Sequence, residues 1–436
     1  MTRKKLFLGA FLATVSLLSA APTVKITLDK ADCLYKCGEK ATFTIVFTDD
    51  KEEPLDPNAS YILTNDNLKQ LKNGTIDLAK TTSLTLTETS GSPAFLQLRL
   101  NAKYTDKDGK KQALKNNLCT AGFEPEKIQP STPNPADLLE YWKGEIAKAN
   151  RECPLDVQMT KLDKYSNDKY TGYKLSFAAP GGRVYGFLNI PTKPGKLPAT
   201  VSVPGAGPGV EAPAVNGDYV TLQMNVHPYD PNIEGKTIKE SYRELNKPGT
   251  YMFQGDKTRE GTFFHRPIIG IARAIEWLAN RPEVDASRIG YYGSSQGGAF
   301  GLIQAGLTGR FAAVVCNVPA MCDHFGAELE RSAGWPQYRN KFKIKDANGN
   351  STFDKSTDSW LPYYDAVNFA RHIHCPIRII VGFIDVTCSP SSVYSAFNSI
   401  PAQDKAIITE TDMGHAVRKS YWGATSWMRG KLTEKQ

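Results

Sequence analysis

The sequence predicts an α/β fold, in which helices flank a mostly parallel sheet, preceded by a small β-sandwich of the immunoglobulin type. Residues 24–121 form short segments of alternating polar and apolar character separated by turns, which is typical of a sandwich. Prolines stiffen residues 124–135 and indicate a domain boundary. Beyond it, strand-like and helix-like segments alternate to the end, an order that favours a parallel sheet. We therefore expect one domain over residues 22–123 and a second, α/β domain over residues 124–436.

The first 21 residues have the composition of a cleaved secretory signal. Arg3, Lys4 and Lys5 precede an apolar run over residues 6–18, and small residues follow it. The run is shorter than the roughly 20 apolar residues that a membrane-spanning helix needs, and no later segment approaches that length. We therefore expect an exported protein, periplasmic or extracellular, without a membrane span.

The overall composition is that of an ordinary globular protein of 436 residues, with 41% hydrophobic and 22% charged residues. The formal net charge is +8, but acidic residues are interspersed with the basic ones, so the sequence predicts no nucleic-acid partner. The spacing of the eight cysteines matches no zinc site, and export would permit disulfides. Cys33 and Cys37 are the first candidates for a disulfide, with free thiols as the alternative.

The second domain, residues 124–436, shows the segments that a sheet with flanking helices requires. Two amphipathic stretches predict helices, and seven short apolar runs predict strands. The helices are expected at residues 137–149 and 267–280, and the strands at residues 184–190, 199–203, 219–226, 288–292, 312–316, 377–381 and 405–409. Ligands of such sheets bind at the carboxyl ends of the strands, where we expect the functional site.

A Gly-x-Ser-x-Gly motif, residues 293–297, stands between the strand-like run 288–292 and a helix-like segment. This context is typical of a nucleophile elbow, a turn so tight that side chains two positions before and after the serine would collide. Gly293 and Gly297 remove those side chains. The motif predicts Ser295 as a nucleophile.

A serine nucleophile needs a base to take its proton and a carboxylate to orient that base. In this type of elbow the chain order is serine, acid, histidine. Asp385 directly follows the strand 377–381, and His415 lies in the loop after the last strand. Both would emerge at the same sheet edge as Ser295. Asp404 and Asp412, which flank the last strand, are weaker candidates for the acid.

The tetrahedral intermediate of acyl transfer needs backbone N–H donors. Gln296, at the start of the helix, is expected to supply one donor, and the glycine-rich loop 204–209 the other. This loop lacks the Gly-Lys-Ser/Thr that a phosphate-binding loop requires. No metal or other cofactor is implied, because a serine hydrolase supplies its own nucleophile.

Residues 135–423 resemble the acetyl xylan esterases and cephalosporin C deacetylases, which are α/β-hydrolases. The resemblance implies hydrolysis of acetyl esters on sugars, the triad Ser295, Asp385 and His415, and oxyanion donors from Ala206 and Gln296. It rests on the elbow and on residues 281–285, 318–323, 364–370, 375–377 and 382–385.

Three motifs depart from that family. His227-Pro228-Tyr229 stands where the family has Arg-Gly-Gln, His415-Ala416 replaces His-Glu, and Pro204-Gly205-Ala206 replaces His-Gly-Tyr. The last change removes an aromatic side chain from the acyl pocket, which would admit a larger acyl group or a bulkier sugar. The added N-terminal domain and the absent Arg-Gly-Gln would alter the contacts of the family's ring-like oligomer.

The leading expectation is a serine esterase that removes O-acetyl groups from plant polysaccharide fragments such as those of xylan, through an acyl-enzyme on Ser295. A related carboxylesterase for other acyl or methyl esters of glycans is the alternative. An inactive carbohydrate-binding protein is a third interpretation, which nothing in the triad supports. The expected partner is an acetylated oligo- or polysaccharide.

Overall fold

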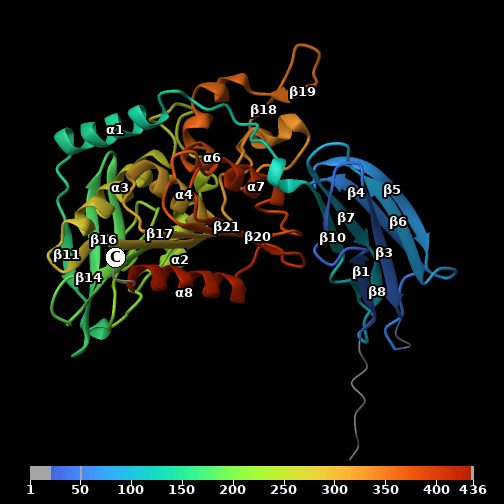
Figure 1. Ribbon diagram of the computed structural model, residues 1–436, viewed down its shortest axis with the longest axis horizontal. Helices are drawn as coiled ribbons and strands as arrows, with labels where there is room; N and C mark the ends of the chain where they lie inside the picture. The colour runs from blue at the N-terminus through green and yellow to red at the C-terminus, as the bar shows by residue number, and fades with distance from the viewer. Residues whose placement is uncertain (1–20, 50–51, 434–436) are drawn as a thin grey trace, which may run out of the picture.

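The computed structural model describes residues 21–49 and 52–433, so the predicted secretory signal, apart from Ala21, lies outside the described residues. The chain forms a β-rich N-terminal part beside a larger α/β part (Figure 1). No helix in the described ranges is both long and apolar enough to cross a membrane.

The N-terminal β region, residues 22–123, consists of two main sheets that share one core. The strands are β1 (Thr23–Leu28), β2 (Leu34–Tyr35), β3 (Lys40–Thr48), β4 (Asn58–Asn65), β5 (Lys69–Asp77), β6 (Ser83–Thr89), β7 (Ala94–Asn101), β8 (Lys103–Thr105), β9 (Lys111–Ala113) and β10 (Leu118–Phe123). One sheet has the order β1-β3-β6 and the other β2-β10-β7-β4-β5, while β8 and β9 form a separate hairpin. Alternate residues of β3, such as Phe43 and Ile45, are buried against Leu98 and Leu100 of β7. This alternation agrees with the sequence pattern.

A mixed nine-stranded sheet forms the centre of the α/β part. Its order is β11-β12-β13-β15-β14-β16-β17-β20-β21, antiparallel from β11 to β15 and parallel from β15 onward. The strands are β11 (Gln158–Lys161), β12 (Tyr170–Ala179), β13 (Gly182–Pro191), β14 (Leu197–Val203), β15 (Val220–Met224), β16 (Val284–Ser294), β17 (Ala313–Asn317), β20 (Ile377–Gly382) and β21 (Lys405–Glu410). The sheet is mostly parallel, as the sequence predicted.

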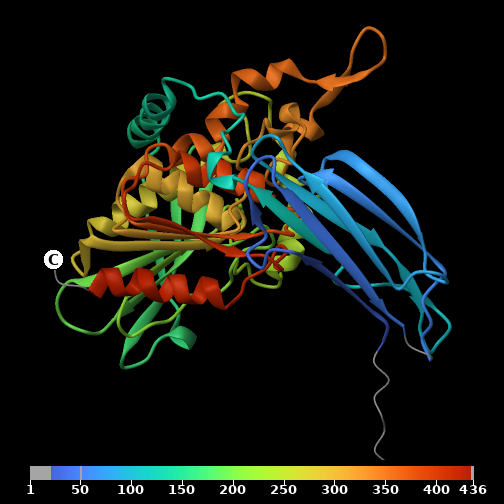
Figure 2. The same ribbon diagram turned by 45° about the vertical axis from the view of Figure 1, so that its right-hand side comes forward.

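Helices cover both faces of this sheet. Helix α4 packs on β14, β16 and β17 from one side, and α8 packs on β16, β17 and β20 from the other (Figure 1). The α-helices are α1 (Leu138–Glu152), α2 (Ile238–Leu245), α3 (His265–Ala279), α4 (Gln296–Thr308), α5 (Tyr338–Lys341), α6 (Ala366–Ala370), α7 (Pro390–Ser399) and α8 (Lys419–Thr433). A small hairpin, β18 (Lys343–Lys345) and β19 (Ser351–Phe353), projects from the surface (Figure 2). Six short 3₁₀ helices also occur among the described residues: η1 (Pro125–Lys127), η2 (Asp163–Tyr165), η3 (Tyr251–Phe253), η4 (Gly326–Leu329), η5 (Lys355–Ser359) and η6 (Leu361–Tyr364).

All seven predicted strands and both predicted helices are present, with shifted ends. The strand before the elbow begins at Val284, four residues earlier than predicted, and β11 and β12 were not predicted. All four residues of β11 are exposed, so this edge strand carries no apolar pattern. Cys33 and Cys37, the first candidates for a disulfide, are both free thiols, as in the alternative interpretation.

The N-terminal β region docks on the α/β part beside α7 (Figure 2). The ring centroid of Phe95 lies 5.2 Å from that of Phe383 and 5.5 Å from that of Tyr394. The buried carboxylate of Asp66 accepts hydrogen bonds from the backbone N–H of Ser391, at 3.3 Å, and from its hydroxyl. The docking surface therefore combines an aromatic contact with a buried polar one.

Candidate active site

Ser295 occupies the sharp turn between β16 and α4, with φ 57° and ψ −121°. This conformation is strained for a residue with a side chain, and such strain is concentrated at functional sites. A Cβ on Gly293 would lie 2.5 Å from the carbonyl oxygen of Gly297, and a Cβ on Gly297 would overlap the carbonyl oxygen of Val203. Only glycine fits at these two positions, so the local sequence produces the turn that exposes Ser295.

The structure brings Ser295, His415 and Asp385 together in one hydrogen-bonded line. His415 Nε2 lies 2.9 Å from Ser295 Oγ, and His415 Nδ1 lies 2.8 Å from Asp385 Oδ2. Because the carboxylate accepts, Nδ1 carries the proton and Nε2 is left free to accept the serine proton. His415 is exposed, whereas Asp385 is fully buried. The arrangement can therefore activate a hydroxyl at a surface that substrate can reach.

The loop that follows β20 fixes the Asp385 carboxylate. Its Oδ1 accepts the backbone N–H groups of Thr387, at 2.8 Å, and Cys388, at 2.9 Å. The backbone N–H of Trp335 donates to the carbonyl oxygen of Thr387 at 2.9 Å and ties this loop to the segment before α5. With Oδ1 occupied by the backbone, Oδ2 is directed to His415. The other two acid candidates, Asp404 and Asp412, form ion pairs with Arg378 and Arg418 instead.

Asn317, at the end of β17, connects the elbow to the histidine loop, and sequence reasoning missed it. Its side-chain NH₂ donates to Ser294 Oγ at 2.8 Å and to the carbonyl oxygen of Ala416 at 2.9 Å. The hydroxyl of Ser294, next to Ser295 in the chain, thus joins this connection. The only signal in the sequence is the position of Asn317, a polar residue at the end of a predicted central strand.

The backbone N–H groups of Gln296 and Ala206 are the two candidate oxyanion donors. Gln296 begins α4, where the first N–H groups of a helix have no intrahelical acceptor. The loop that follows β14 lies against the elbow, because a Cβ on Gly205 would lie 3.8 Å from Ser295 Cβ. Ala206, the next residue, is exposed. Within the described chain, neither the Ala206 nor the Gln296 N–H donates to another residue.

Three side chains that follow β15 hold the loop 204–210 in place. Asn225 accepts from the N–H of Val210 and donates to its carbonyl oxygen, both at 2.8 Å. His227 Nε2 lies 2.7 Å from the carbonyl oxygen of Gly207, and Tyr229 donates to the carbonyl oxygen of Pro208 at 2.5 Å. Because its partner is an acceptor, His227 Nε2 carries the proton.

Burial lowers the pKa of His227 to about 4, so this imidazole is neutral at neutral pH. Its ring packs among aromatic side chains, with Tyr251 at 4.8 Å and Tyr229 at 5.2 Å between centroids. Tyr251 in turn donates to Gln296 Oε1 at 2.5 Å. His227 and Tyr229 therefore hold the loop of Ala206, and Tyr251, which packs on His227, holds the side chain of Gln296. The two candidate oxyanion donors are thus supported by one connected group of side chains.

Among the described residues, one group of three metal-binding side chains lies close together: Asp385, Cys388 and His415, with ligand atoms within 4.8 Å of one another. Asp385 and His415 already hydrogen bond to each other, so we interpret this group as part of the catalytic arrangement. Burial raises the pKa of the Cys388 thiol, which keeps it neutral. Nothing in the sequence pattern pointed to this cysteine.

Comparisons with known proteins agree on one family. The family model described as acetyl xylan esterase (AXE1) matches residues 124–428. Acetyl esterase Axe7A of Xylanibacter ruminicola is 30% identical over 410 residues, which cover 92% of this chain and 89% of that protein. Two solved structures, acetyl xylan esterases from Paenibacillus sp. R4 and Thermoanaerobacterium sp. JW/SL YS485, are each 22% identical. Their TM-scores are 0.57 and 0.56; they cover 70% and 71% of this chain and 98% of their own.

Proposed function

Because the chain belongs to the acetyl xylan esterase family and is a serine carbohydrate esterase, we propose that it removes O-acetyl groups from plant polysaccharide fragments through an acyl-enzyme on Ser295. The observation that carries this proposal is the line from Ser295 Oγ to His415 Nε2 and from His415 Nδ1 to Asp385, with distances of 2.9 and 2.8 Å. An inactive carbohydrate-binding protein would not need a serine, a histidine and an aspartate that are hydrogen bonded in this order.

In the acylation step, His415 Nε2 takes the hydroxyl proton of Ser295 while Oγ attacks the ester carbonyl carbon. The carbonyl electron pair moves to oxygen and forms a tetrahedral oxyanion. Asp385 stabilises the imidazolium that results. His415 then gives the proton to the sugar oxygen, the carbon–oxygen bond of the ester breaks, and the deacetylated sugar leaves an acetyl group on Ser295.

The backbone N–H groups of Ala206 and Gln296 are the proposed donors to the oxyanion. Each such donor contributes roughly 3 to 4 kcal/mol of transition-state stabilisation in serine hydrolases. Their rigid support from His227, Tyr229 and Tyr251 matters because donors that are already in position need no reorganisation during the reaction.

In the deacylation step, His415 removes a proton from water, the hydroxide formed attacks the acetyl carbon, and a second oxyanion forms. The bond to Ser295 Oγ then breaks, Oγ recovers the proton from His415, and acetic acid leaves and releases its proton to the solvent. His415 is the group that moves the proton in both the acylation and the deacylation step.

The test is acetate release from acetylated xylan fragments by the wild type, Ser295→Ala and a control, Ser426→Ala on the exposed side of α8. We expect Ser295→Ala to lose at least about 10⁴-fold in kcat, since removal of a serine nucleophile costs about 10⁶-fold in a well-studied hydrolase. The control should match the wild type. Equal acetate release by all three proteins would disprove the proposal.

A wider acyl preference is a second proposal, supported by Ala206, which is exposed beside the elbow where the family has an aromatic residue. The measurement is kcat/KM for acetyl, butyryl and feruloyl esters of one alcohol. The Ala206→Tyr variant should narrow the preference to acetyl. A wild type that already rejects butyryl and feruloyl esters would contradict this idea.

We further propose that residues 22–123 form a β-sandwich domain, that residues 124–436 form the hydrolase domain, and that residues 1–21 direct export to the periplasm or beyond. The two sheets with a common core support the first statement. N-terminal sequencing of the mature protein tests the export signal: a chain that retains Arg3 would rule out cleavage. Mass determination in solution tests whether the family's ring-like oligomer forms.

A further inference from the structure

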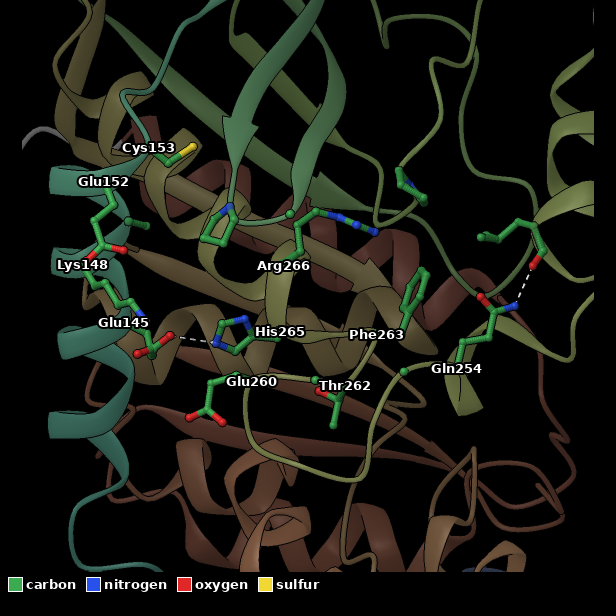
Figure 3. A pocket seen from close by; sticks show the side chains of 17 residues that line it. Glu145, Lys148, Glu152, Cys153, Gln254, Glu260, Thr262, Phe263, His265 and Arg266 are labelled. Carbon is green, nitrogen blue, oxygen red and sulfur yellow. Dashed lines mark hydrogen bonds and ion pairs between the residues drawn. The ribbon is translucent and has the colours of Figure 1, made fainter.

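A cavity of about 670 Å³ lies between α1, the start of α3 and the loop 254–263 (Figure 3). None of Ser295, Asp385 and His415 lines it. Phe263 forms part of its wall and also packs on Tyr251, with ring centroids 4.9 Å apart. This volume falls within the range of about 300 to 1,000 Å³ that is typical of small-molecule binding sites. The cavity is therefore a candidate binding site next to, but separate from, the catalytic groups.

Arg266 lines this cavity and has no acceptor for its charge. In the described chain, its buried Nε has no hydrogen-bond partner and no carboxylate forms an ion pair with its guanidinium. The side chain extends toward Phe263, whose ring centroid lies 5.8 Å from the guanidinium carbon, and away from Glu145 (Figure 3). A partly buried cation without a partner costs free energy, so its presence here indicates a ligand that supplies the acceptor.

The position of Arg266 in α3 strengthens this argument. It is the second residue of a 15-residue helix, whose N-terminus carries a partial positive charge. A cation at this end of a helix is disfavoured by the protein alone, whereas an anion would satisfy both the guanidinium and the helix end. Guanidinium groups bind planar carboxylates in a bidentate geometry.

The other side of the cavity is rich in groups that bind hydroxyls. Glu145, Glu152 and Lys148 come from α1 and Glu260 from the loop before α3, whereas Gln254 lies across the cavity, on the far side of Phe263 (Figure 3). Glu145 lies 3.0 Å from His265 Nε2, and Glu260 accepts from Tyr141 at 3.3 Å. The carboxylates repel an anion at this end, but their oxygens accept hydrogen bonds from neutral hydroxyl groups. The Arg266 side of the cavity therefore suits a carboxylate, and the glutamate side suits neutral hydroxyl groups.

We propose that this cavity binds an acidic sugar, with the sugar carboxylate on Arg266 and its hydroxyl groups on the glutamates and Gln254. The face of the sugar ring would lie near Phe263. The site is independent of ester hydrolysis, although it takes a carbohydrate ligand from the same class as the substrate. It would hold a carboxylated unit of the polysaccharide while a different unit occupies the triad.

The experiment is calorimetric titration of the full chain carrying Ser295→Ala, so that binding is measured without turnover. The probes are glucuronate, glucose and acetate, which separate the carboxylate from the sugar. We expect glucuronate to bind at least about tenfold more tightly than either of the other two, since a charged hydrogen bond contributes a factor of about 10 or more. A failure of the esterase proposal would leave this measurement unaffected.

Arg266→Gln, made in the same background, should weaken glucuronate binding at least about tenfold. Arg151→Gln is the matched control, because Arg151 is exposed on α1 and does not line the cavity. Equal binding of glucuronate and glucose, or equal losses in the two variants, would overturn the proposal. Acetate that binds as tightly as glucuronate would overturn the assignment of a sugar. If Arg266→Gln does not fold, the comparison of the three probes still decides.

Discussion

Replacing Asp66 with Asn should stabilise the protein increasingly as the pH rises. Burial raises the pKa of the Asp66 carboxyl from 3.8 to about 7, against the opposing effects of Ser391, Ser389 and Arg331. The folded protein therefore favours the protonated form, and the free energy of unfolding falls as the pH rises from about 4 to 7. At 1.36 kcal/mol per unit, this shift amounts to a loss of up to about 4 kcal/mol above pH 7. Asn avoids this loss, still accepts hydrogen bonds from Ser391 and tolerates the positive φ of 42°.

The assay is urea unfolding of the full chain at several pH values between 4 and 8, read from the first transition because two parts of the chain can unfold separately. The gain of Asp66→Asn over the wild type should be small at pH 4 and largest at pH 8. Asp108→Asn, at an exposed turn, controls for the loss of one negative charge. A stability difference that stays constant from pH 4 to pH 8 would refute the reasoning.

Two further substitutions test the elbow and its support. Gly297→Ala should destabilise the protein by more than about 3 kcal/mol in thermal or urea unfolding, since its Cβ would overlap the carbonyl oxygen of Val203. Gly423→Ala in α8, where a Cβ meets open space, should instead stabilise it by about 0.5 to 1 kcal/mol, and equal effects of the two changes would contradict the clash. His227→Phe removes the hydrogen bond to the carbonyl oxygen of Gly207 and should lower kcat about 5- to 30-fold with little change in KM. A rise in KM at unchanged kcat would argue against a role of His227 in holding the loop 204–210 beside Ser295.

The sequence predicted the central strands and the elbow because parallel strands buried on both faces are short apolar runs, and because few turns require Gly-x-Ser-x-Gly. The same reasoning could not find Asn317, whose side chain contacts Ser294, 23 positions earlier, and Ala416, 99 positions later. Such contacts depend on how strands are ordered, which local patterns do not encode. The edge strand β11 escaped prediction for a different reason, since its exposed residues leave no periodic signal.

The departures from the family were visible in the sequence, but their physical meaning was not. The substitution of Arg-Gly-Gln by His-Pro-Tyr was predicted to affect the oligomer. In the structure, His227 and Tyr229 hydrogen bond to the loop that carries Ala206, a contact that the sequence did not indicate, and the effect on the oligomer stays a prediction. The loop after β14 and the segment after β15 are neighbours only in the folded protein, so the sequence alone did not indicate this contact.

The docking of the N-terminal β region has a consequence for how the enzyme loses activity on heating. Phe95, in the N-terminal β region, packs on Phe383, two residues before Asp385, the proposed catalytic acid. The turn that carries Asp385 therefore depends partly on a contact with the N-terminal β region. Detachment of that part would release the turn while the central strands stay folded, since regions of a protein can open at different free energies. Inactivation should then precede the loss of helical circular dichroism, as two separate melting curves. The temperature at which activity is lost would then depend on the contact between the N-terminal β region and the α/β part. Stronger packing at that contact would raise this temperature without any change near Ser295.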